Sequence, residues 1–163
     1  MDFFKFYKDF ETALSRLKLP SDCTQHEPEW EPTLPPLFWQ VTVIFDFASD
    51  SKHIRIWESY EKIGGLYMSR RNQWSYHYGR AESFDEDGKS ERGSPDDPVD
   101  LRIDTTSGLH MHYQQREPHY RQDQIDGLNL KSVEAVGFVR AVLRHRSRGQ
   151  DFAKILGFKI KGA

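Results

Sequence analysis

Cysteine is almost absent from this sequence, which has only Cys23 among its 163 residues. No internal disulfide can therefore form, and Cys23 lies in a proline-rich segment with no base beside it to activate the thiol. No apolar run approaches the roughly 20 residues that cross a bilayer. The N-terminus also lacks the basic start, apolar stretch and cleavage site of a signal peptide. These absences predict a cytoplasmic protein without membrane contacts.

The strong catalytic signatures are missing as well. The sequence contains no Walker loop, no GxGxxG, GxSxG or HExxH motif and no paired CxxC motif. The enzyme classes that carry these motifs are thus disfavoured, and any site has to be built from less specific groups of polar residues.

Apolar residues are scarce, but they include aromatic residues with large rings. Hydrophobic residues make up 37% of the chain and charged residues 29%, with a mean hydropathy of −0.76. The aromatic share is 13%, and each buried ring removes a large area from water. A chain of this length can therefore form a single domain with one core.

The net charge of −2 hides a gradient along the chain. Residues 82–100 contain eight acids and two bases, whereas residues 140–161 contain seven bases and one acid. The basic C-terminal surface can attract phosphate or an acidic partner. A solvated helix face explains the same basic pattern equally well.

Periodicity predicts the order of the elements. Apolar residues at three- and four-residue steps predict a helix over residues 2–19, and five prolines make residues 20–36 an extended connector. From residue 37 the apolar repeat changes to two, which predicts short antiparallel strands. These strands are expected at residues 37–47, 53–60, 66–69, 73–80, 99–104 and 109–113.

The remaining segments complete a single α+β domain over residues 1–163. Acids, glycines and prolines predict a flexible acidic insertion over residues 82–98. A second helix is expected over residues 130–146, with Asn129 as its N-cap and Gly149 at its end, followed by a basic tail over residues 147–163. We expect an antiparallel sheet of about four to six strands with both helices packed on one side.

Three histidines gather in one short stretch. His110 and His112 point to the same face of a strand, and His119 follows a proline that can turn the chain back toward them. Together they could hold Zn²⁺ or another divalent metal, with Asp104 or Glu117 as a further ligand or as an orienting group.

The same pattern also suits acid–base chemistry without a metal, because a pair of imidazoles can serve as general base and general acid. Nearby arginines would stabilise the charge of a scissile phosphate, and tyrosines would stack on a base. The predicted catalytic residues are His110, His112, Arg102 and Arg121, with Arg116 as a further candidate for phosphate. The predicted substrate contacts are Tyr113, Tyr76, His77 and His119, with Tyr78 as an alternative. Histidines that have no catalytic role are the third reading.

Several of these stretches resemble a known family when they are taken in order. They are an aromatic strand from Trp74 to Tyr78, an R-x-D strand ending at Asp104, and a histidine-rich loop from His110 to Arg121 before the closing helix. This order resembles the TumE-like toxins of bacterial toxin–antitoxin systems, over the second half of the chain. Family members carry aromatic and histidine residues directly after the R-x-D strand, where this chain has residues 105–108, Thr-Thr-Ser-Gly. The resemblance implies a small cytosolic growth-inhibiting protein that is neutralised by a helix-turn-helix antitoxin encoded beside it.

Three functions follow as expectations. The leading one is a bacterial or phage protein, toxin-like or defence-associated, that acts on RNA as a metal-independent ribonuclease. The second is a non-enzymatic inhibitor or binding protein that docks through its acidic segment, and the third is a metal-binding domain. An exposed sheet edge and the many aromatic residues also favour a homodimer.

Overall fold

The computed structural model describes residues 3–32, 38–64, 67–80, 99–105, 108–114 and 119–162. Within them, an antiparallel sheet of eight strands runs in the order β1-β3-β4-β5-β6-β7-β8, and β2 is also paired with β3. The strands are β1 (Cys23–Gln25), β2 (Glu29–Pro32), β3 (Phe38–Phe47), β4 (Lys52–Gly64), β5 (Tyr67–Arg80), β6 (Val99–Asp104), β7 (His110–Tyr113) and β8 (Tyr120–Arg121). A small second sheet pairs β9 (Ile125–Asp126) with β10 (Lys159–Ile160).

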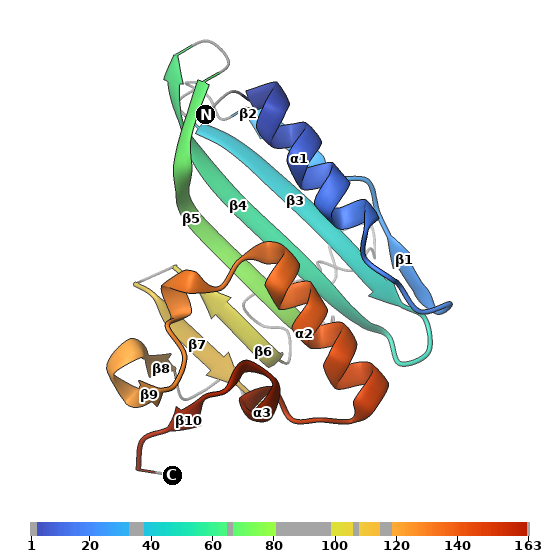
Figure 1. The fold of residues 1–163 in the computed structure, drawn as a ribbon, viewed down its shortest axis with the longest axis vertical. Helices are drawn as coiled ribbons and strands as arrows, with labels where there is room; N and C mark the ends of the chain where they lie inside the picture. Colours follow the sequence, from blue (N-terminus) through green and yellow to red (C-terminus); the bar gives the residue numbers. More distant parts are fainter. Residues whose placement is uncertain are drawn as a thin grey trace, which may run out of the picture.

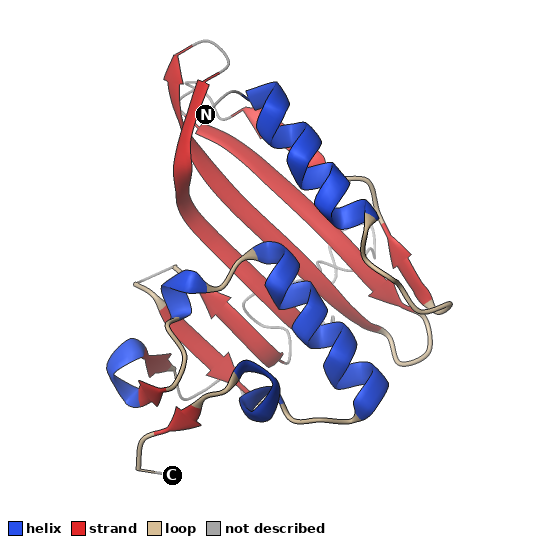
Figure 2. Ribbon diagram, viewed as in Figure 1, coloured by secondary structure: helices blue, strands red, loops and turns tan. Residues whose placement is uncertain are grey.

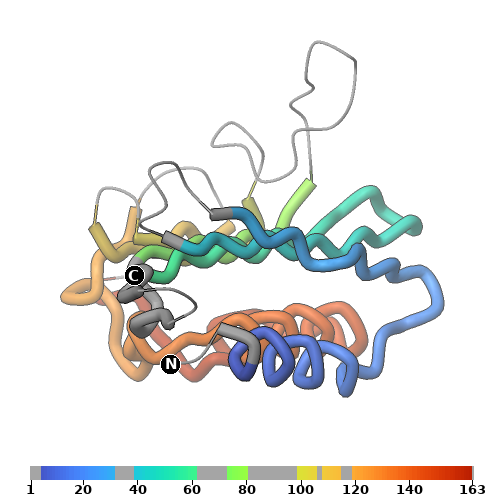
Figure 3. The backbone as a smooth tube through the Cα atoms, turned by 90° about the horizontal axis from the view of Figure 1, so that it is seen from above, coloured from blue at the N-terminus to red at the C-terminus, as the bar shows by residue number. Residues whose placement is uncertain are grey.

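The helices form a second layer on one face of the large sheet, as Figures 1 and 3 show. They are α1 (Phe3–Ser15), α2 (Ala135–Arg148) and the short α3 (Phe152–Leu156), with 3₁₀ turns η1 (Gln122–Gln124) and η2 (Leu130–Ser132). Figure 2 shows α1 lying along the first strands and α2 lying along the later ones. This arrangement confirms the α+β class and the placement of both helices on one side. Among the described residues, no helix is long and apolar enough to cross a membrane.

The core lies between this helix layer and the sheet. Alternate residues of β3 face the helices, so Val41, Val43 and Phe45 are fully buried, as a period of two requires. On α1, the Phe6 ring lies 4.6 Å from Tyr60. On α2, the Phe138 ring lies 5.5 Å from Tyr76.

Some boundaries differ from the sequence prediction. The proline-rich connector contributes two strands, β1 and β2, because short edge strands tolerate prolines that a central strand would not. The two strands expected around residues 66–80 are one strand, β5, whose irregular register with β4 absorbs the break. The acidic insertion expected over residues 82–98 lies outside the described residues.

The two predicted helix boundaries also shift. The first helix ends at Ser15, because Pro20 disfavours helical backbone just before it and the chain has to turn toward β1. Asn129 caps η2, where its side chain accepts a hydrogen bond from the Lys131 amide, and α2 begins later at Ala135. Gly149 does end α2, in a left-handed conformation with φ 63°.

Candidate histidine centre

The β6–β7 hairpin carries the predicted site on the sheet face away from the helices, which we call the outer face. Leu101, Ile103 and Met111 point to the helices and are fully buried. Because neighbours in a strand alternate, the residues between them point to the outer face. The register sets Asp104 opposite His110, and Arg102 opposite His112.

Three imidazoles converge on this face, and we call His110, His112 and His119 the histidine cluster. The Nε2 atoms of His110 and His112 are 3.1 Å apart. The His119 ring centre lies 4.9 Å from that of His110 and 4.1 Å from that of His112. One ring nitrogen from each of the three lies within 4.8 Å of the others. His110 and His112 are buried and His119 is exposed, so the cluster can be reached from solvent at His119.

Hydrogen bonds hold the cluster in one orientation. The backbone carbonyl of Gly108 lies 2.6 Å from Nδ1 of His110, and since a carbonyl only accepts, Nδ1 carries the proton. In the neutral ring, Nε2 of His110 therefore presents its lone pair to the other two rings. Asp104 is 1% exposed, with one carboxylate oxygen 3.4 Å from Nε2 of His110. Its other oxygen accepts a 2.5 Å hydrogen bond from Nε of Arg102.

These distances suit a metal ion. Two nitrogens bound tetrahedrally to Zn²⁺ at about 2.0–2.1 Å lie about 3.3–3.4 Å apart. The nitrogen–nitrogen distance of 3.1 Å is close to this value. The carbonyl that fixes His110 is the outer partner that a ligating imidazole generally has, and the Asp104 carboxylate lies beside the cluster, 3.4 Å from Nε2 of His110.

The same distances are less suited to acid–base catalysis by His110 and His112. A base and an acid in phosphoryl transfer serve the attacking and the leaving oxygen, which lie roughly in line on opposite sides of phosphorus. The Nε2 atoms of the two imidazoles lie 3.1 Å apart, in direct contact. They leave no space for a phosphate between them.

The other predicted residues divide between the two faces of the sheet. Arg121 on β8 is the register partner of His110, and His77 on β5 is the register partner of Arg102. Both therefore share the outer face with the histidine cluster. The candidates Arg116 and Glu117 lie outside the described residues.

The tyrosines lie on the opposite face, where they cannot contact a substrate held by the histidines. Tyr76 is fully buried against α2, and Tyr78 is 1% exposed in the same layer. The Tyr113 hydroxyl donates a hydrogen bond to Asp151, and burial together with this carboxylate raises the pKa of Tyr113. The structure thus does not bring Tyr76 and Tyr113, the predicted substrate contacts, to the face of the histidine cluster, because each lies one residue out of step with a histidine or arginine on its strand.

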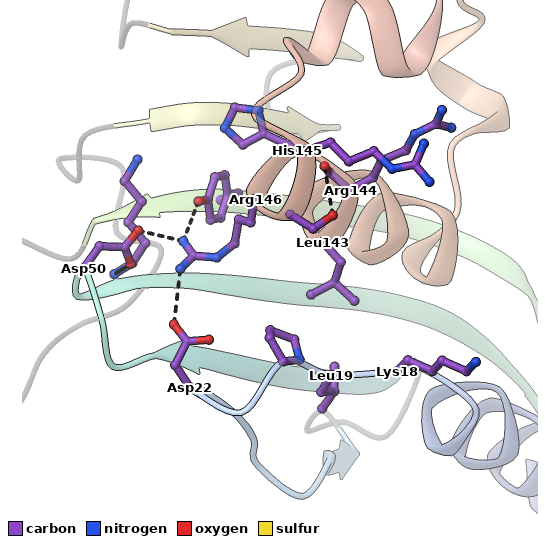
Figure 4. A pocket seen from close by; sticks show the side chains of 13 residues that line it. Lys18, Leu19, Asp22, Asp50, Leu143, Arg144, His145 and Arg146 are labelled. Carbon is purple, nitrogen blue, oxygen red and sulfur yellow. Dashed lines mark hydrogen bonds and ion pairs between the residues drawn. The ribbon is translucent and has the colours of Figure 1, made fainter.

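The basic segment of α2 lines a cavity of about 800 Å³ at the helix end, among the first residues after α1 and the turn between β3 and β4 (Figure 4). Arg146 crosses this cavity and donates hydrogen bonds of 2.7 Å to Asp50 and 2.9 Å to the Tyr78 hydroxyl. Its guanidinium also lies 3.8 Å from the centre of the Phe47 ring. Arg146 therefore joins α2 to the sheet, and its charge is already neutralised by protein groups.

Comparison with family models, curated proteins and solved structures finds no match for this chain.

Proposed function

We propose that the histidine cluster binds a divalent transition-metal ion and that the protein uses it to hydrolyse phosphodiester bonds of RNA. One observation carries this proposal: three imidazoles, two of them buried, meet with a ring nitrogen each inside 4.8 Å. Bringing buried imidazoles together has a desolvation cost that a metal ion would offset. Imidazole nitrogen is a preferred ligand of Zn²⁺ and related ions.

The surrounding side chains supply the rest of the chemistry. The three imidazoles would hold the metal ion, which would supply the Lewis acidity that lowers the pKa of water toward neutrality. The Asp104 carboxylate, 3.4 Å from Nε2 of His110, would take up the proton of the attacking water. The water oxygen would form the new P–O bond while the ester P–O bond breaks, and Asp104 would return its proton to the leaving oxygen, so that the step balances. Arg102 and Arg121 share the outer face with the cluster, where their charges would stabilise the phosphorane-like transition state.

RNA as the substrate rests on two supports. Guanidinium groups beside the cluster suit a phosphate group, and the resemblance to TumE-like toxins implies a growth-inhibiting protein. Degradation of RNA in the cell that makes the protein would cause such inhibition. A partner that covers the histidine cluster would neutralise it, as an antitoxin does.

The proposal is tested with purified protein that is stripped with a chelator and incubated with single-stranded RNA. We expect no cleavage in chelator and cleavage after Zn²⁺, Mn²⁺ or Co²⁺ is added. His112→Ala should lower the rate by at least about 100-fold, because a ligand is lost. His26→Ala is the matched control, since His26 is an exposed imidazole hydrogen-bonded to Asp46, and it should cleave at the wild-type rate.

Two results would contradict this function. Equal cleavage in chelator and in metal would show a metal-independent ribonuclease. No cleavage under any condition, with His112→Ala and wild type alike, would remove the hydrolase assignment.

A further inference from the structure

A row of polar side chains continues from the histidine cluster across the outer face. Arg55 on β4 is the register partner of His77 on β5, which is the partner of Arg102 on β6, which is the partner of His112 on β7. Two guanidinium groups therefore stand in one line with the cluster. Neighbouring strands are about 4.8 Å apart, so the backbones of Arg55 and Arg102 are separated by about 10 Å.

Arg55 is part-buried and makes no hydrogen bond or ion pair with any residue in the described part of the chain. The carboxylates on the strands beside Arg55 are engaged by other side chains. Asp46 bonds His26 at 2.7 Å, Asp100 bonds Lys52 at 2.8 Å and Asp104 bonds Arg102 at 2.5 Å. Burial lowers the pKa of Arg55, and the neighbouring charge of Arg102 lowers it further.

Arg102 also keeps donors for a ligand. Its side chain is 12% exposed, and Asp104 takes the Nε hydrogen. Within the described ranges the two terminal nitrogens are left to donate to a ligand. Both guanidinium groups remain charged in the protein. Asp104 compensates the charge of Arg102, whereas Arg55, which is partly removed from water, needs an anion for compensation. Their planar forks suit phosphate oxygens in particular.

An aromatic side chain stands beside this row. Trp57 lies two residues from Arg55 on β4, so its part-exposed ring is also on the outer face. Its register partner Ser75 is in turn the partner of Asp104, which places Trp57 on the line of residues that leads to His110. Proteins that bind single-stranded nucleic acid place basic side chains along its phosphate backbone and stack its bases on aromatic rings.

We propose that Arg55, Arg102 and Trp57 form a binding site for single-stranded nucleic acid that leads across β4–β6 to the histidine cluster. The strand lies with one phosphate at Arg102, next to the cluster, a further phosphate at Arg55, and a base on Trp57. The site deepens the proposed function by setting its substrate class, a strand that has phosphates on both sides of the cleaved bond. The binding site depends on the proposed function only in that RNA is taken as the nucleic acid that it binds.

The test uses the full chain in chelator, so that it does not depend on the metal or on hydrolysis. A fluorescent single-stranded RNA of about ten nucleotides is titrated with wild type, Arg55→Gln and Trp57→Ala at several salt concentrations, and single-stranded DNA is run in parallel. We expect Arg55→Gln to bind about tenfold more weakly, with a salt slope smaller by about 0.7 to 1. Trp57→Ala should also bind about tenfold more weakly, with an unchanged slope, because stacking releases no counterions.

Arg144→Gln is the matched control, because Arg144 is an exposed arginine of α2, on the helix side of the sheet. It should bind like the wild type. The thermal midpoint of Arg55→Gln should equal or exceed that of wild type, since the substitution removes a charge that no described carboxylate balances. This result would separate a ligand-binding arginine from a structural one.

Arg55→Gln with wild-type affinity and slope would overturn the site, and so would a wild type that binds neither nucleic acid. If the wild type binds the strand but shows no metal-dependent cleavage, the hydrolase proposal fails and the binding site stands. Equal binding of RNA and DNA would support the site as one for nucleic acid of either kind.

Discussion

Cys23 lies on the edge strand β1, next to Asp22 in the chain, and Asp46 is the register partner of the following residue, Thr24. Burial, followed by the charge of Asp22, raises the pKa of its thiol from 9.0 to about 11. The folded state therefore holds the thiol proton more tightly than the unfolded chain does. The resulting contribution to stability is present below pH 9.0 and is lost as the pH rises toward 11.

We expect the Cys23 thiol to be alkylated slowly in the folded protein. At pH 8 its thiolate fraction should be about 100-fold lower in the folded protein than in the unfolded chain. Alkylation by iodoacetamide should slow by about the same factor relative to protein in urea, with mass spectrometry as the readout. Equal rates in folded and unfolded protein would contradict the raised pKa.

At the histidine centre, residue type and strand period predict the face of each side chain but not the distances between them. The HxH spacing was enough to put His110 and His112 on one face. The contact of His119 with both depends on how the chain turns between β7 and β8, which no local pattern specifies. Arg55 could have been found from the alternation around Ile54 and Ile56. That none of the carboxylates in the described part of the chain pairs with Arg55 follows only from the pairing of distant strands.

Among the elements, the β9–β10 ladder depends on one close backbone approach. Gly127 has φ +86°, and a Cβ at this position would overlap the carbonyl oxygen of Gly157. Gly149 has a comparable φ of +63° and no neighbouring atom within 4 Å of a Cβ. Substitution of either glycine would therefore strain the backbone. Only at Gly127 would the added Cβ also lack space.

Substitution of each glycine by alanine separates these two effects. Gly149→Ala should lower the free energy of unfolding by about 1–2 kcal/mol, the cost of a left-handed residue with a Cβ. Gly127→Ala should lower it by about 3 kcal/mol or more, because backbone has to move as well. Urea denaturation measures both, and equal losses would show that the approach of residue 157 is unimportant.

Elements with a clear period were predictable, and those shaped by distant pairing were not. The apolar periods of α1, β3 and α2 indicated these elements to within a few residues. The strands β1 and β2 were missed because prolines weaken the local strand signal, and pairing with β3 compensates for it. Asn129 was assigned to the wrong element because η2 and α2 follow one another closely, and either could use the cap.

In the whole molecule, the two faces of the large sheet carry different kinds of residues. The face toward the helices holds the aromatic and aliphatic core, including the buried tyrosines that sequence reasoning had assigned to a substrate. The outer face carries histidines, arginines and Asp104 in register across β4 to β8. The hydrophobic core thus lies on the helix side, where the buried Glu58 carboxylate also accepts hydrogen bonds from Tyr60 and Tyr76. The histidine centre stands at the end of the polar row on the outer face.

The metal content of the purified protein tests most directly whether the three histidines form a metal centre. Protein dialysed against Zn²⁺ and then against metal-free buffer should retain close to one ion per chain, measured by mass spectrometry with inductively coupled plasma. The variant in which His110 and His112 are both replaced by Ala should retain less than about a tenth of an ion, and His26→Ala should retain the full amount. Retention by the double variant equal to that of wild type, or no retention by the wild type, would contradict a metal centre at the three histidines.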